Sequence, residues 1–146
     1  MNEAPILIGY DGSEDARRGI DSAVVLFGRR RAVVLDVAPV VTPAESLATI
    51  TPGPYAFEEY NRSEAAPVAE EGARYARAVG LDAEARVDVA APTWQAIVDV
   101  ADEIDAAVIV MGTRGLNGAR ELFEGSVSHQ VAQHAGRPVL IVPPPR

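Results

Sequence analysis

Residues 108–128 read VIVMGTRGLNGARELFEGSVS, and the rest of the chain can be interpreted outward from this stretch. An apolar run of strand length, Ala106 to Met111, ends where the glycines begin. Two residues separate Gly112 from Gly115, and nine separate Gly115 from Gly125, which Ser126 follows directly. The residues from Ser126 to Ala135 follow a helical pattern. The stretch therefore predicts a buried strand, a glycine loop and the N-terminus of a helix.

This order of elements is suited to binding an anion. Glycine lets a ligand approach the backbone closely, and the free amides and dipole at a helix N-terminus attract a phosphate. Ser126 has the hydroxyl either to cap the helix or to bind a phosphate oxygen. The stretch is not a P-loop, which needs a lysine after its last glycine, because all 13 basic residues of the chain are arginine. A phosphate here would be held by backbone amides, hydroxyls and the loop's two arginines, Arg114 and Arg120.

A second motif, PILIGYDGS, occupies residues 5–13. Pro5 to Gly9 is a short apolar run typical of a buried strand. Ser13 is a favourable N-cap for a helix with acidic residues in its first turn, and Gly28 ends that helix. Asp11 thus stands at the end of a strand, where it is either a simple turn residue or a carboxylate that binds a ligand.

The remaining segments alternate between strand and helix patterns. Strands are predicted at 32–37, 83–89 and 137–142, a short helical turn at 56–60, and helices at 64–80 and 93–103. Pro67 is expected in the first turn of the 64–80 helix, since a proline inside a helix costs about 3 kcal/mol. Prolines make residues 38–54 a loop of unpredicted shape. The pattern predicts one α/β domain, residues 1–146, with a five-stranded parallel sheet and helices on both faces.

Composition excludes several classes of protein. The chain has 146 residues, a formal net charge of −8 and a pI near 4.7, which disfavours nucleic acid and anionic membrane surfaces as main partners. It contains no cysteine, so there is no disulfide, thiolate nucleophile or cysteine zinc site. The sequence shows neither a signal peptide nor a membrane span, and the expected location is cytoplasmic.

The G-x2-G-x9-G-S motif, preceded by VIVM and followed by RPVLIV at 137–142, closely resembles the ATP-binding type of the universal stress protein family. The resemblance runs from Ile6 to Val142. It implies a Rossmann-like fold, similar to the adenine nucleotide alpha hydrolases, with strand order 3-2-1-4-5. The ligand would lie where the order reverses, between the ends of the first and fourth strands.

The resemblance also implies roles for individual residues. Asp11 would accept hydrogen bonds from ribose hydroxyls, and Val37 would pack on adenine, with Pro5 and Met111 near the base. The residues expected around the phosphates are Gly112, Gly115, Gly125, Ser126 and Val127, and Tyr10 and Arg114 complete the expected nucleotide-binding set.

Two acidic residues depart from the family pattern. Glu124 stands beside the phosphate glycine, where the family usually has an apolar residue. Its charge would repel a triphosphate unless the side chain points away or holds a divalent metal such as Mg²⁺ or Mn²⁺. Asp36 occupies a position where many relatives have histidine.

Three functions compete. The first is a regulatory protein that binds ATP with at most slow hydrolysis, since no residue stands out as a base and no lysine is available to stabilise transferring phosphate. The second is a dimeric adaptor of the same fold that binds no ATP, which Glu124 makes possible. The third is an adenylating enzyme or ATP pyrophosphatase, disfavoured because the YDGS sequence at 10–13 matches neither signature of those enzymes.

The last strand predicts an assembly. Residues 139–142 are a continuous apolar run at an expected sheet edge, and exposed edges offer unpaired backbone groups to another chain. The resemblance likewise implies a homodimer formed through this strand. The alternative is a monomer whose edge is covered by the proline-rich loop. His129, His134 and Trp94 are interpreted as ordinary helix and packing residues.

Overall fold

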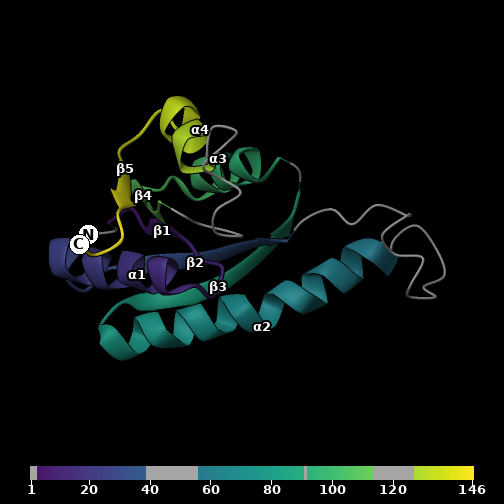
Figure 1. Ribbon diagram of the computed structural model, residues 1–146, viewed down its shortest axis with the longest axis horizontal. Helices are drawn as coiled ribbons and strands as arrows, with labels where there is room; N and C mark the ends of the chain where they lie inside the picture. Colours follow the sequence, from purple (N-terminus) through teal and green to yellow (C-terminus); the bar gives the residue numbers. More distant parts are fainter. Residues whose placement is uncertain (1–2, 39–55, 91, 114–126) are drawn as a thin grey trace.

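The computed structural model describes residues 3–38, 56–90, 92–113 and 127–146, except for the side chains of residues 56–65. Strands and helices alternate along these segments (Figure 1). The strands are β1 (Ile6–Gly9), β2 (Arg31–Ala38), β3 (Asp82–Val89), β4 (Val108–Gly112) and β5 (Val139–Val142). The helices are α1 (Glu14–Phe27), α2 (Ala56–Val79), α3 (Thr93–Ile104) and α4 (Val127–His134).

All five strands form one parallel sheet in the order β3-β2-β1-β4-β5. The predicted fold class and strand order are therefore confirmed. β1 is the central strand, and its Ile8 is in register with Val34 of β2 on one side and Val110 of β4 on the other. The chain goes from β1 to β2 on one side and later returns to β4 on the other, so the strand order reverses beside β1.

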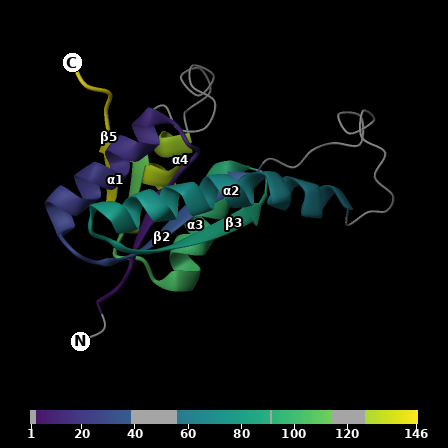
Figure 2. The ribbon, with the colours of Figure 1, turned by 90° about the horizontal axis from the view of Figure 1, so that it is seen from below.

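Helices cover both faces of the sheet, with α1 and α2 on one face and α3 and α4 on the other (Figure 1). From below, α1 and α2 lie side by side across their face (Figure 2). Alternate residues of β1 enter different cores: Ile6 and Ile8 pack with α1 and α2, whereas Leu7 packs with α3 and α4. Such burial on both faces explains why the strands are almost continuously apolar.

Local signals set several boundaries as expected. The Ser13 hydroxyl accepts a hydrogen bond from the Ala16 amide at 3.1 Å and caps α1, and Gly28, with φ of 66°, ends it. β4 begins two residues later than predicted, at Val108, because Asp105 adopts a left-handed conformation and Ala106 still bonds to the last turn of α3. The last strand also begins two residues later, at Val139.

The prediction for the Pro67 region was wrong. In place of a short turn and a separate helix from about Glu64, α2 is one helix of 24 residues with Pro67 inside it. The proline penalty is local, about 3 kcal/mol, and the Pro67 ring is exposed, so it neither clashes with the sheet nor ends the helix. Of the helices in the described part of the chain, α2 included, none is both long and apolar enough to cross a membrane.

Two helical glycines give a matched test of this packing. A Cβ on Gly72 of α2 would lie 2.5 Å from Cδ1 of the Tyr10 ring, whereas a Cβ on Gly19 of α1 would lie 3.6 Å from Val110, an ordinary contact. We expect Gly72→Ala to destabilise the fold by about 2 kcal/mol through overpacking. Gly19→Ala should be neutral or stabilise it by about 0.5–1 kcal/mol through helix propensity. Urea unfolding of both variants measures the difference, and equal effects would contradict the close α2–Tyr10 packing.

Candidate functional site

The reversal of strand order places a cleft at the carboxyl ends of β1, β2 and β4, where ligands of open α/β sheets bind. Its volume is about 360 Å³, including the part open to solvent. Residues of both helical layers join the strand ends in lining it, most of them apolar: Gly9, Tyr10, Asp11, Ala16, Leu35, Val37, Ile97, Met111, Gly112 and Val127. The cleft thus has an apolar floor, and Asp11 is the ionisable carboxylate in its lining.

Backbone geometry fixes Asp11 at the rim of this cleft. Its Oδ1 accepts a hydrogen bond from the Ser13 amide at 2.9 Å, and Gly12 between them has φ of 85°, a conformation that favours glycine. This Asx turn leads directly into the capped start of α1. Because one carboxylate oxygen is held by the turn, the side chain is oriented before any ligand arrives.

Gly112 has a packing role that the sequence did not reveal. A Cβ at this position would lie 3.0 Å from Cβ and 3.1 Å from the carbonyl oxygen of Asp15. The glycine therefore lets the first turn of α1 approach the end of β4, which narrows the cleft. Asp15 itself is buried and pairs with Arg18 one turn later.

Tyr10 contributes to the cleft, but its side chain is directed toward α1 and α2. The ring packs against Gly72, and the hydroxyl donates to Oε2 of Glu71 at 2.8 Å. Arg17 contacts the same hydroxyl and pairs with Glu71. Burial, the largest cause, raises the pKa of Tyr10, so the ring stays neutral and the group ties β1 to α2.

Asp36 is a buried carboxyl group beside the cleft. Its exposed fraction is 8 %, and it lies in β2 between Leu35 and Val37, which both line the cleft. Burial, and to a smaller extent the negative charge of Asp11, raises the pKa of Asp36 to about 6. The carboxyl group therefore takes up a proton in mildly acidic solution.

The structure brings together six of the predicted site residues and separates one from them. Tyr10, Asp11, Val37, Met111, Gly112 and also Val127 line the cleft. Pro5 does not: it lies at the amino end of β1 in a polar depression with Arg31 and Asp82. The placement of Pro5 near the base is corrected, because β1 runs away from Pro5 toward the cleft. The expected positions Arg114, Gly115, Gly125 and Ser126, and with them Arg120 and Glu124, lie outside the described residues.

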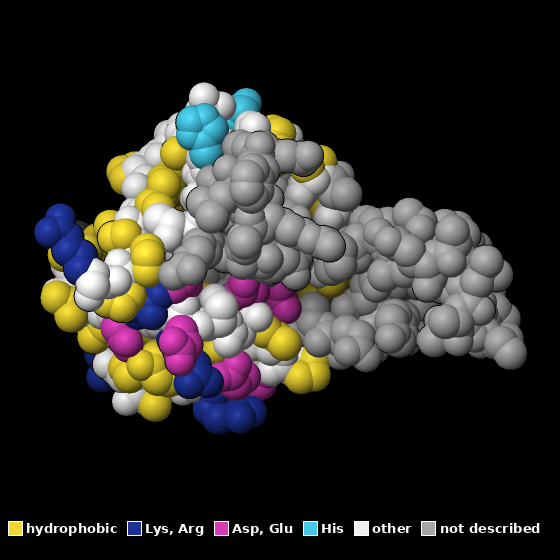
Figure 3. Space-filling view, viewed as in Figure 1, with side chains coloured by type: hydrophobic (Ala, Val, Ile, Leu, Met, Phe, Trp, Pro, Cys, Tyr) yellow, Lys and Arg dark blue, Asp and Glu magenta, His cyan; other side chains and the backbone are white. Residues whose placement is uncertain are grey.

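The histidines lie away from the cleft lining. His129 and His134 are exposed on α4, and Figure 3 shows histidine side chains at the surface. The His134 ring stacks on Trp94, with the two ring centroids 4.4 Å apart. Trp94 packs against the core between the sheet and the helices α3 and α4, in agreement with its interpretation as a packing residue. In the described segments, no three His, Asp or Glu side chains come together in a way that could hold a metal ion.

Sequence reasoning missed four lining residues, Gly9, Ala16, Leu35 and Ile97. Their apolar patterns predicted burial but not which end of the core they occupy. Leu35 carried one usable signal, since it stands two residues before Val37 on the same face of β2. Ile97 belongs to a helix whose position over the sheet end is set only by packing.

Known proteins share this architecture. The profile of the universal stress protein family matches residues 4–143. The universal stress protein YxiE of Bacillus subtilis (strain 168) is 33% identical over 144 residues, which cover 94% of this chain and 97% of that protein. A universal stress protein from Archaeoglobus fulgidus, solved in complex with dAMP, is 26% identical with a TM-score of 0.65, covering 97% of this chain and 99% of that chain. A universal stress protein solved in complex with cAMP shares the fold at 24% identity, with a TM-score of 0.68 and coverage of 96% and 98%.

The buried carboxyl group predicts a pH-dependent stability. The pKa of Asp36 is about 6 in the folded protein, against an ordinary value of 3.8. The folded state therefore binds the proton more tightly, and stability falls as the pH rises through this window. Asp36→Asn should raise the free energy of unfolding by about 1–3 kcal/mol above pH ~7 and by little below pH ~4. Denaturant titrations across this range test the effect, and a gain independent of pH would contradict it.

Proposed function

Because the chain belongs to the universal stress protein family, we propose that it binds an adenine nucleotide in the cleft between the ends of β1 and β4 and acts as a regulatory protein. The observation that carries the proposal is the combination of an apolar slot with a pre-oriented carboxylate at the reversal of strand order. Relatives of the same fold solved with dAMP and with cAMP support it.

The apolar floor suits the adenine ring. Leu35, Val37 and Ile97 come from the α3 side of the sheet, and Met111 closes the slot from β4. A flat aromatic base loses its hydration shell on entering such a slot, and apolar contact supplies the favourable free energy.

The ribose and phosphates would lie toward the rim. The free oxygen of Asp11 can accept a hydrogen bond from a ribose hydroxyl, because its other oxygen is held by the Ser13 amide. The phosphates would lie near the N-terminus of α4, where Val127 lines the cleft and the helix dipole favours negative charge. Gly115, Gly125, Ser126 and Arg114 remain the proposed phosphate contacts.

The proposal also concerns how many phosphates the bound nucleotide carries. The glycine motif favours ATP, and Mg²⁺ or Mn²⁺ could then offset part of its charge. Asp11 lines the cleft and Asp36 is buried beside it, and the repulsion between these carboxylates and a nucleotide grows with each phosphate. Glu124, next to Gly125 in the sequence, would add to this repulsion if it faces the phosphates. Binding assays should therefore compare AMP with ATP, with and without magnesium. Slow hydrolysis at most is expected.

We further propose a cytoplasmic homodimer built through β5. This strand lies at the sheet edge, and each of its four residues is only half-buried. Leu140 and Val142 pack toward α1 and α2 and Val139 toward α3 and α4, and Ile141 alternates with them at the exposed edge. A second copy of β5 related by a two-fold axis would pair with the exposed edge and cover these side chains.

The first prediction of this proposal concerns Asp11. Native mass spectrometry of freshly purified protein should show an adenine nucleotide, and calorimetry should show adenosine binding. Asp11→Asn keeps the Ser13 hydrogen bond but loses the charged acceptor, so adenosine affinity should fall about tenfold. Asp21→Asn, which replaces an exposed carboxylate on α1, is the matched control and should bind as the wild type does. Unchanged binding by Asp11→Asn would remove Asp11 from the site, and no adenine ligand bound by wild type would refute the function.

The second prediction of this proposal concerns the edge strand β5. In size-exclusion chromatography with light scattering, the wild type should have the mass of a dimer, near twice 15.4 kDa, at micromolar concentration. Ile141→Lys should shift it to the monomer, since two like charges would meet across the two-fold axis. Ile141 is half-buried, so thermal unfolding first verifies that this variant is folded. Val25→Lys alters an 83 % exposed residue of α1 and should leave the mass unchanged. A monomeric wild type would remove the dimer.

A further inference from the structure

The position of Asp36 links it to the cleft through the backbone. The register pairs Gly9 with Leu35, and the Tyr10 amide donates to the Leu35 carbonyl at 2.8 Å. Tyr10 and Asp11, which follow β1, therefore lie beside Asp36 of β2 at the carboxyl ends of the two strands. Leu35 and Val37 face the α3 side and line the cleft, so Asp36 between them faces the opposite side, which α2 covers. Its carboxyl group is buried directly behind the cleft wall.

No basic group compensates for this burial among the side chains that the structure describes. After β1, the neighbouring titratable groups are Tyr10 and Asp11, and on β3 the register partner is the apolar Val87. Arg17 of α1 contacts the Tyr10 hydroxyl, but its guanidinium pairs with Glu71 of α2. Among the described groups, the charge that acts on Asp36 is that of Asp11, and it has the same sign.

The two carboxyl groups differ in what a ligand does to them. Asp11 lines the cleft and is held by the Ser13 amide, so it remains available to a ligand hydroxyl. Asp36 is 8 % exposed and has no access to such a partner, so an anion in the cleft can only increase the repulsion on its charged form. In a buried environment this repulsion is screened weakly by salt. Taking up a proton is the simplest way for Asp36 to relieve it.

We propose that Asp36 couples the binding of an anionic adenine nucleotide to the uptake of one proton, so that mild acidification tightens binding. This inference rests on the proposed function and adds a regulation to the same site. With its pKa at about 6 before the ligand arrives, Asp36 is mainly ionised at neutral pH and becomes protonated as the pH falls. The nucleotide binds best to the protonated form, and linkage requires that its binding in turn favours that form.

The test uses cAMP, whose single phosphodiester charge does not change between pH ~5 and ~8, so that only the protein titrates. Wild-type affinity for cAMP should rise about three- to tenfold from pH ~7.5 to pH ~5.5. Adenosine, which carries no phosphate, should show a clearly smaller rise. Calorimetry in two buffers of different ionisation enthalpy should show net proton uptake with cAMP near pH 6.5.

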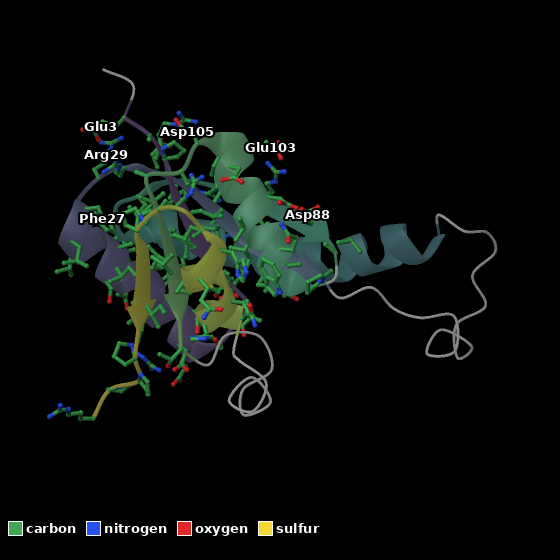
Figure 4. All side chains as sticks on the ribbon, turned by 90° about the horizontal axis from the view of Figure 1, so that it is seen from above. Glu3, Phe27, Arg29, Asp88, Glu103 and Asp105 are labelled. Carbon is green, nitrogen blue, oxygen red and sulfur yellow. The ribbon has the colours of Figure 1, made fainter. Side chains whose placement is uncertain are left out.

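Asp36→Asn should bind cAMP at every pH about as tightly as the wild type does in acid, because an amide stands in for the protonated carboxyl. Asp88→Asn is the matched control: Asp88 lies two residues beyond Arg86 on β3, near α3 (Figure 4), and acts on Arg86 instead of on Asp36. This variant should keep the wild-type pH profile. Thermal unfolding first verifies that each variant is folded.

The outcomes separate the two proposals. If wild type binds cAMP with the same affinity throughout the range, or if Asp36→Asn keeps the wild-type slope, the proton coupling is overturned and nucleotide binding stands. If wild type binds neither cAMP nor adenosine at any pH, the proposed function and the coupling fall together.

Discussion

The structure depends on the complete burial of β1 between two helical layers. Ile6, Leu7 and Ile8 are each 0 % exposed, with alternate side chains in the two cores and hydrogen-bonded neighbours on both edges. Both neighbours pair with β1 in parallel, and the crossover helices that parallel strands require cover the two faces of the sheet. The residues that follow β1, Tyr10 and Asp11, are thereby delivered to the point where the sheet order reverses.

Small residues let the helical layers close around this end of the sheet. Gly112 admits the first turn of α1, and Gly72 admits the Tyr10 ring against α2. On the opposite side, Arg137 unites the ends of α3 and α4 and the start of β5: its guanidinium donates to the carbonyls of Ala101 and Ala106 and pairs with Asp102. One end of the molecule is thus sealed by hydrogen bonds, and the other keeps a cleft.

Two described carboxyl groups lie at or beside this cleft, those of Asp11 and Asp36. Most described acidic residues outside it are solvated or paired with arginine, as Glu70 is with Arg77 and Glu103 with Arg86. Asp36 is different, since it is buried without a basic partner among the described side chains and lies beside a second carboxylate. Its charge is therefore unfavourable to the fold. Such local conflicts are typical of functional sites.

The sequence by itself determined the element order, the parallel sheet, the capped start of α1 and the strand that ends at Gly112, because these depend on local periodicity and on backbone conformation. The resemblance carried by the glycine motif supplied the strand order and the identity of Asp11, Val37 and Met111 as cleft residues. Pro67 shows where local reasoning failed, since a local helix penalty did not decide the extent of α2. The resemblance suggested Pro5 near the base, whereas Pro5 lies at the end of β1 far from the cleft.

Only the tertiary structure decided that Ile97 and Leu35 complete the apolar slot, that Gly72 and Gly112 are packing glycines, and that Asp36 is buried against Asp11. The physical reason is common to all of them. Their environments are created by residues far away in the chain, and a pattern of 3.6 or two residues reports which side of an element is buried but not what it is buried against.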